Sequence, residues 1–190
     1  MNTASKSKKL NVLSMAQISV CTALLCVSAW ISIPIPIISV PFTLQALVII
    51  LVALLLKPAY ALTAQIIYTL LGIVGLPVFS GFKGGIGSVL SPTGGFIIGF
   101  IISAFLVSLL KGKTDNILRY ILISIFVGIP AMYIPGIIGF MLYTGSDLLY
   151  AIVTLTSIFI VVDIVKCIIA SLAAVALKKA LSKANIGFER

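Results

Sequence analysis

One apolar stretch near the C-terminus constrains the fold of this chain most strongly, because two charged residues lie close to its centre. The stretch runs from residue 148 to residue 177 and contains Asp163 and Lys166. In a helix that rises about 1.5 Å per residue, Asp163 is roughly 20 Å from either end. A charge at that depth costs several kcal/mol unless it is paired or faces a polar cavity. The spacing of three residues puts both charges on one helix face, where they can compensate each other.

This pair has two interpretations. It is either a structural ion pair that helps one helix pack on its neighbours, or part of a ligand site. A buried ion pair is weak evidence for stability, because desolvation can cancel the attraction between the charges. Ionisable residues inside a membrane helix more often mark a functional site. We therefore favour a ligand site that contains Asp163 and Lys166.

The composition predicts an all-α, polytopic membrane protein with one domain over residues 1–190. The chain is 61% hydrophobic and 9% charged, with a mean hydropathy of +1.30, which excludes an ordinary soluble domain. Its apolar runs predict six transmembrane helices, at about 14–31, 42–56, 59–74, 95–110, 117–142 and 148–177.

The basic residues predict the orientation of these helices. Six spans put both termini on one side, and eleven of the thirteen Lys and Arg residues lie on that side. Lys83 lies on the opposite side, and Lys166 lies within the last span. This asymmetry places both termini in the cytosol. The net charge of +9 is thus an orientation signal, and we expect no nucleic acid as a partner.

Two unusual loops are expected to lie together on the outer face. Residues 32–42 contain three prolines, and residues 75–95 contain seven of the fifteen glycines. Proline cannot continue a helix, and glycine lets a backbone approach a ligand closely. These loops cover the helices that carry Gln45 and the charged pair. The arrangement favours a small polar ligand that is captured from outside.

The residue inventory argues against catalysis. Histidine is absent, there are only four acids, and the phosphate-binding pattern GxxxxGK[ST] does not occur. The three cysteines, Cys21, Cys26 and Cys167, have no zinc-site spacing. We therefore expect no metal and no cofactor, and a membrane-embedded enzyme is the weaker alternative. A stand-alone carrier that uses Asp163 as its proton site is another alternative.

Four dispersed motifs resemble the BioY family, the biotin-specific S components of energy-coupling-factor (ECF) transporters. They are SVPFTLQAL (39–47), GLPVFSGFKGG (75–85), SPTGGFIIGF (91–100) and VDIVK (162–166). Ser91 and Phe96 depart from a GPTGGY-like pattern, and Phe82 stands where a second glycine is common. The resemblance implies a six-helix protein in the plasma membrane of a prokaryote. It also implies biotin as ligand, and a transmembrane coupling protein and two cytosolic ATPases as partners.

The resemblance also implies roles for individual residues. Asp163 can accept a ureido N–H of biotin, and Lys166 can donate to the ureido oxygen or pair with a carboxylate. The secondary polar candidates are Gln45, Thr43 and Thr93, and the candidates for an apolar lining are Trp30, Phe79 and Tyr143.

Small residues in the first span are candidates for partner docking. Ser19 and Ala23 form a small-xxx-small pair, with Ala16 one turn earlier. Such a pair lets another helix approach closely. Family members use an AxxxA motif on this span to contact the coupling protein. Packing within the chain's own helix bundle is the alternative for these residues.

Overall fold

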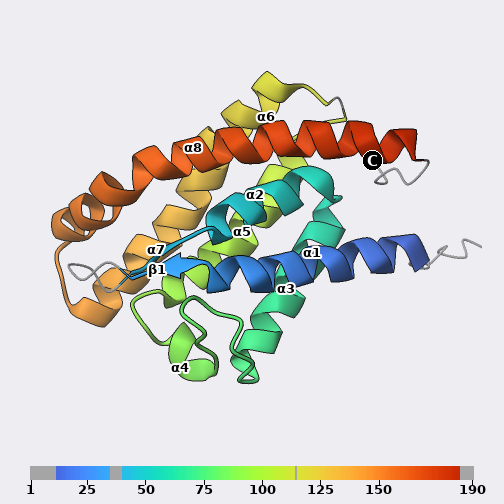
Figure 1. Ribbon diagram of the computed structural model, residues 1–190. Coiled ribbons are helices and arrows are strands. Elements are labelled where there is room, and N and C mark those ends of the chain that lie inside the picture. The colour runs from blue at the N-terminus through green and yellow to red at the C-terminus, as the bar shows by residue number, and fades with distance from the viewer. Residues whose placement is uncertain (1–11, 35–39, 114, 185–190) are drawn as a thin grey trace, which may run out of the picture.

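A computed structural model describes residues 12–34, 40–113 and 115–184 and shows a bundle of helices (Figure 1). The prediction of a helical fold is confirmed. The elements are α1 (Val12–Trp30), β1 (Ser32–Ile33), β2 (Phe42–Thr43), α2 (Gln45–Leu55), α3 (Pro58–Ile73), α4 (Ile86–Val89), α5 (Gly94–Leu110), α6 (Ile117–Ile123), the π-helical segment η1 (Ser124–Gly128), α7 (Ile129–Thr144) and α8 (Leu148–Lys183).

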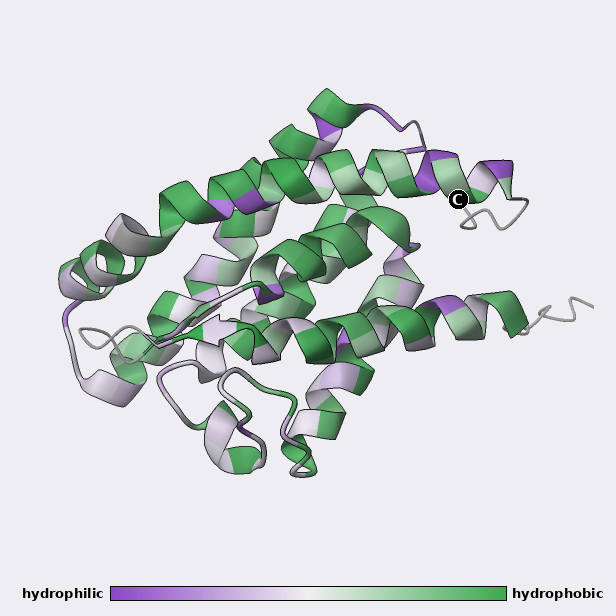
Figure 2. Cartoon of the chain, viewed as in Figure 1, coloured by the Kyte–Doolittle hydropathy of each residue, from purple (hydrophilic) through white to green (hydrophobic). Residues whose placement is uncertain are grey.

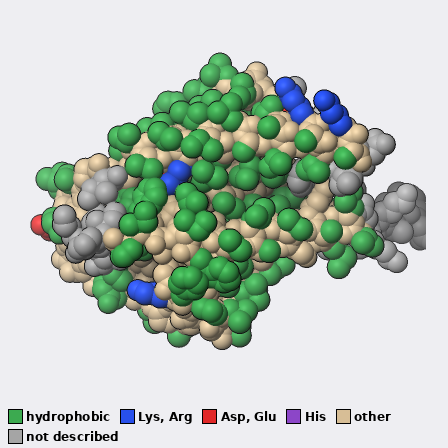
Figure 3. All heavy atoms as spheres, viewed as in Figure 1, with side chains coloured by type: hydrophobic (Ala, Val, Ile, Leu, Met, Phe, Trp, Pro, Cys, Tyr) green, Lys and Arg blue, Asp and Glu red, His purple; other side chains and the backbone are tan. Residues whose placement is uncertain are grey.

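The helices and the surface have the character of a membrane protein. Three helical segments are long and apolar enough to cross a membrane, namely Val12–Trp30, Ile117–Thr144 and Phe159–Lys183. The apolar helices at the second, third and fourth predicted spans are shorter, namely Gln45–Leu55, Pro58–Ile73 and Gly94–Leu110. Large apolar side chains are spread over the visible surface, and charged side chains are few there (Figure 3). The count of six spans and the orientation of the termini stay predictions.

The second predicted span begins later than residue 42. Phe42 and Thr43 form strand β2, which pairs antiparallel with β1 through Ser32↔Thr43 and Ile33↔Phe42. This short pairing closes the base of the predicted proline-rich loop, whose residues 35–39 lie outside the described residues. Helix α2 therefore starts at Gln45, directly after the strand.

The fifth predicted span is continuous but changes its hydrogen-bond pattern near Pro130. The π-helical segment η1 ends at Gly128, and Pro130 stands in the first turn of α7. Proline has no N–H to donate, and a wider π turn is a common way to accommodate such a gap. Ser103 of α5 donates to the carbonyl of Gly128 at 3.0 Å and so links α5 to the end of this segment. Pro135 lies inside α7.

Helices α5 and α7 touch backbone to backbone. A Cβ atom added at Gly95 would lie 2.1 Å from the carbonyl oxygen of Pro135. One added at Gly99 would lie 2.5 Å from the carbonyl oxygen of Met132. The Gly95-x-x-x-Gly99 spacing therefore allows close helix packing. This contact fixes the wall of the cavity that is described next.

Helix α8 continues to Lys183 and so extends past the predicted end at residue 177. Figure 2 shows a short hydrophilic stretch near the middle of this helix and further hydrophilic residues near its C-terminal end. Asp163 and Lys166 lie near the middle of α8 in sequence, and both are buried. The helix thus carries these two charges into the bundle rather than towards the surrounding lipid.

Candidate functional site

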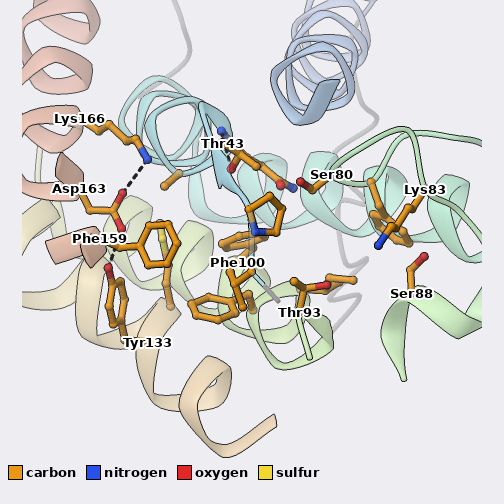
Figure 4. A pocket seen from close by; sticks show the side chains of 18 of the residues that line it. Thr43, Ser80, Lys83, Ser88, Thr93, Phe100, Tyr133, Phe159, Asp163 and Lys166 are labelled. Carbon is orange, nitrogen blue, oxygen red and sulfur yellow. Dashed lines mark hydrogen bonds and ion pairs between the residues drawn. The ribbon is translucent and has the colours of Figure 1, made fainter. Parts of the chain in front are cut away.

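A cavity lies where α2, α5, α7 and α8 meet the glycine-rich loop after α3 (Figure 4). Six of the eight sequence-predicted ligand residues line it, namely Thr43, Gln45, Phe79, Thr93, Asp163 and Lys166. The cavity wall is otherwise mainly aromatic and aliphatic, with Phe96, Phe100, Met132 and Phe159 among its residues. The fold therefore brings most of the candidate residues to one place.

The charged pair lies at one end of this cavity. Lys166 Nζ is 2.8 Å from Asp163 Oδ1, and the two residues are 5% and 8% exposed. The hydroxyl of Tyr133 donates to the other carboxylate oxygen, Oδ2, at 2.8 Å (Figure 4). Both oxygens of Asp163 thus have a protein donor. Each can still accept a further hydrogen bond, because a carboxylate has about four acceptor positions.

Lys166 has a second neighbour in β2. Its Nζ atom lies 4.1 Å from the centre of the Phe42 ring. A cation over an aromatic face gains about 0.5 to 2 kcal/mol. Carboxylate and ring together hold the ammonium at the cavity wall. An ammonium has three N–H donors, so donors remain for a ligand after the bond to Asp163.

Tyr133 was not among the sequence-predicted residues. It lies in α7, and its link to Asp163 depends on how α7 packs against α8. A single tyrosine in an apolar span gives no spacing signal. Only a search for hydroxyl groups able to partner a buried carboxylate would have included it.

A second polar chain supports the middle of the cavity. Gln45 Nε2 donates to the hydroxyl of Tyr68 at 2.6 Å, and Tyr68 is fully buried. The Tyr68 ring meets Phe79 edge to face, with 5.7 Å between ring centres. Phe79 also lies directly against Gly72, where an added Cβ would be 2.1 Å from the ring. Gln45 and Phe79 are therefore held in place by α3.

The other end of the cavity is formed by the glycine-rich loop. Figure 4 shows Lys83 and Ser88 at the end opposite Asp163, with Ser80 and Thr93 between. The hydroxyl of Ser80 is buried and has no hydrogen-bond partner among the described residues. Lys83 is exposed and adds a positive charge at the rim. This end can thus receive an anionic or hydrogen-bonding group.

Trp30 anchors the loop instead of lining the cavity. Its Nε1 donates to the carbonyl of Pro77 at 2.6 Å, and its ring stacks on Phe82 with 5.5 Å between centres. Val40 and Pro41 of the first predicted outer loop line the same cavity as Phe79 and Ser80 of the second, so the described parts of the two loops do lie together. Tyr143 is also absent from the cavity lining, because it lies 60% exposed in the last turn of α7. Trp30 and Tyr143 thus differ from the predicted placement.

Phe82 adopts a backbone conformation that favours glycine. Its φ angle is +60°, in the left-handed region that costs an ordinary residue about 1–2 kcal/mol. Glycine is common at this position of the motif described above, and glycine adopts this conformation without strain. Stacking on Trp30 offsets the cost, because such aromatic pairs contribute about 0.5–1.5 kcal/mol. Phenylalanine in place of glycine therefore costs backbone strain but adds a side chain that anchors the loop to Trp30.

The cavity is small in this conformation. Its free volume is about 80 Å³, below the roughly 300–1,000 Å³ usual for small-molecule sites. A ligand with a bicyclic ring and a side chain therefore requires the loop or the aromatic wall to move. Among the described residues, no cluster of His, Cys, Asp and Glu suits a metal ion.

Comparison with models of known protein families shows which family this chain belongs to. The model of the BioY family matches residues 2–183. The chain belongs to the BioY family.

Individual BioY proteins and one solved structure agree with this assignment. The biotin transporter BioY of Thermotoga maritima is 41% identical over 83% of this chain and 91% of its own length. BioY2 of Lactococcus lactis subsp. cremoris is 36% identical over 90% of this chain and 93% of its own. The crystal structure of an S-component for biotin from an ECF-type ABC transporter superposes with a TM-score of 0.82. That protein is 27% identical, and the match covers 87% of this chain and 90% of the other.

The candidate docking residues lie on the outside of the bundle. Helix α1 buries one face, which includes Ile18, Cys21 and Leu25. Ala16, Ser19 and Ala23 are all exposed on the other side. Their exposure contradicts the alternative interpretation, in which these residues pack within the chain's own helix bundle. The face is available to lipid or to another membrane helix.

We predict that Tyr133→Phe destabilises the protein without any ligand present. The change removes the donor to Asp163 Oδ2 and leaves part of a buried carboxylate unpaired, which costs about 1–3 kcal/mol. The melting temperature of the purified protein in detergent measures the effect. Tyr143→Phe is the matched control, because Tyr143 is exposed. Equal melting temperatures for the two variants would contradict the role of Tyr133.

Proposed function

We propose that this chain is the biotin-binding S component of an ECF transporter and takes up biotin with an ATP-driven module. One observation carries the proposal. In a chain of the BioY family, a buried carboxylate–ammonium pair faces an apolar cavity that ends in a second polar region. Such a cavity suits a ligand with two polar ends and an apolar middle.

Biotin has this distribution of groups. Its ureido ring offers two N–H donors and a carbonyl acceptor, which match the free acceptor positions of Asp163 and the free donors of Lys166. The thiophane ring and the aliphatic chain match the wall of Phe96, Phe100 and Phe159. The carboxylate then extends towards Lys83 and the hydroxyl of Ser80, which has no hydrogen-bond partner in the described part of the chain.

The reverse placement, with the carboxylate on Lys166, is less favourable. It brings a second carboxylate next to Asp163 in a buried site, and like charges at that distance disfavour each other. The ureido ring brings no net charge to the pair. We therefore assign the ureido ring to the Asp163 end of the cavity.

Capture of biotin requires a change of shape. The cavity of about 80 Å³ must widen, and the glycine-rich loop is the element best suited to move. Gly75, Gly81 and Gly85 all have positive φ angles there. The Trp30–Phe82 stack and the bond from Trp30 to Pro77 then set how easily the loop opens.

Partners supply the energy for uptake. The chain has no nucleotide-binding motif, so a transmembrane coupling protein and two ATPases provide the ATP-driven step. The exposed small residues Ser19 and Ala23 on α1 form the docking surface for the coupling protein. A stand-alone proton-coupled carrier would instead show uptake by this chain alone that an uncoupler abolishes.

We predict that the purified protein binds biotin and that Asp163→Asn weakens binding. The loss of a buried charge-assisted hydrogen bond corresponds to roughly 2–5 kcal/mol, or about 30-fold to several thousand-fold in affinity. Calorimetric titration measures it. Asp147→Asn, at an exposed aspartate before α8, is the matched control and should bind like the parent.

A double replacement separates a ligand role from a structural one. Asp163→Leu combined with Lys166→Met removes both charges, so neither is left alone in the bundle. We expect a folded protein without biotin binding. A double variant that binds biotin like the parent would make the pair structural and would contradict the proposed site.

The proposed orientation predicts that Lys83 faces the cell exterior. A Lys83→Cys variant in intact cells should react with a membrane-impermeant maleimide. The three native cysteines are buried or half-buried, and the parent protein controls for their reaction. Labelling only after permeabilisation would place residue 83 in the cytosol and contradict the proposed orientation.

A bulky side chain on the docking face should separate uptake from binding. We predict that Ala23→Phe abolishes biotin uptake by the assembled transporter but leaves biotin binding to the isolated subunit intact. Val161→Phe, at a 66% exposed position of α8, is the control. If Ala23→Phe abolished binding as well, or left uptake unchanged, the docking surface would lie elsewhere.

A further inference from the structure

A second, larger cavity lies at the end of the bundle where α8 ends, remote in sequence from the loop that forms the first cavity. Its volume is about 720 Å³. The α2–α3 turn, the C-terminal end of α5 with the residues after it, and the last turns of α8 line it. Its walls contain six lysines and one acid, namely Lys57, Lys111, Lys113, Lys178, Lys179, Lys183 and Asp115.

Two of these lysines hold the cavity together. Lys111 is 8% exposed and donates to the carbonyls of Ala53 and Leu54 at 3.0 and 2.9 Å, and also to that of Leu56. These carbonyls belong to the end of α2, where a helix has no partners of its own for its last oxygens. Lys178 of α8 bonds to Asp115 at 3.1 Å. The cavity walls are therefore tied to one another by hydrogen bonds and an ion pair.

The remaining lysines give the cavity its charge. Lys113, Lys179 and Lys183 are exposed, and Lys57 is half-buried at the start of α3. Figure 3 shows cationic side chains gathered near the end of α8, on a surface that is otherwise mostly apolar. Burial, followed by the neighbouring Lys178, lowers the pKa of Lys111 to about 7. One acid among six lysines leaves the cavity short of negative charge.

We propose that this cavity binds the phosphate headgroup of an anionic phospholipid. The cavity lies at the ends of apolar helices, which is the depth of the headgroups in a bilayer. Basic pockets between transmembrane helices commonly hold such headgroups. Leu109 lines the cavity and is 53% exposed, and Leu177 on α8 is 41% exposed, so acyl chains have apolar surface beside it.

A single exposed lysine elsewhere on the bundle would not form a binding site for a headgroup. A solvated basic face near the cytosol orients the chain but does not enclose a ligand. Here the lysines converge on one cavity from three separate segments of the chain. The bound headgroup would join α8 to the α2–α3 turn and to the residues after α5. A headgroup in this cavity would therefore also stabilise the folded bundle.

The test compares two double variants of the full-length protein. Lys113→Gln/Lys179→Gln removes two charges from two separate segments that line the cavity. The control variant, Lys113→Arg/Lys179→Arg, keeps both positive charges at the same two positions. Native mass spectrometry of each protein, titrated with phosphatidylglycerol or phosphatidylcholine, measures the bound lipid. Biotin binding by the cavity variant checks that it is folded.

We expect the parent to retain phosphatidylglycerol in preference to phosphatidylcholine. At about 1 kcal/mol for each lysine near the membrane surface, the cavity variant should bind phosphatidylglycerol about 30-fold more weakly. The control variant should stay within about threefold of the parent. Equal lipid binding by the two double variants would overturn the proposal.

Two further outcomes would also overturn it. If inorganic pyrophosphate bound the parent as tightly as phosphatidylglycerol, the cavity would serve a soluble phosphate compound instead of a lipid. If the cavity variant bound phosphatidylglycerol like the parent but did not assemble with the ATP-driven module, the lysines would serve a protein partner.

Discussion

The structure depends on holding a carboxylate and an ammonium in the middle of an apolar bundle. Asp163 and Lys166 meet at 2.8 Å on α8, and groups from other elements complete the arrangement. Tyr133 of α7 donates to the carboxylate, and the ring of Phe42 in β2 lies below the ammonium. Without these partners the burial of either charge would cost several kcal/mol. Segments that are distant in sequence must therefore converge on α8.

Much of this site could be predicted from residue chemistry along the chain. The depth of the two charges marks a site, and the BioY motifs add Thr43, Gln45, Phe79 and Thr93, all of which line the cavity. The helical class follows from the long uninterrupted apolar runs, because a helix satisfies its own backbone hydrogen bonds within a bilayer. These inferences concern local chemistry, which a sequence contains directly.

The remainder depends on tertiary packing and could not be predicted. Tyr133 reaches Asp163 only because α7 lies against α8, and spacing within one span does not reveal this contact. Trp30 and Tyr143 are aromatic residues of apolar spans, but one anchors a loop and the other faces outward. The motif comparison singled out Phe82 as a departure from glycine. Its positive φ angle and its stacking partner become visible only in three dimensions.

A structure of the protein with biotin bound tests the central claim most directly. The account predicts the ureido ring within hydrogen-bond distance of Asp163 and Lys166, with the Tyr133–Asp163 bond retained. It also predicts the carboxylate at the Lys83 end of a widened cavity. A bound biotin whose bicyclic ring lies elsewhere, with Asp163 contacting only Tyr133 and Lys166, would contradict the account.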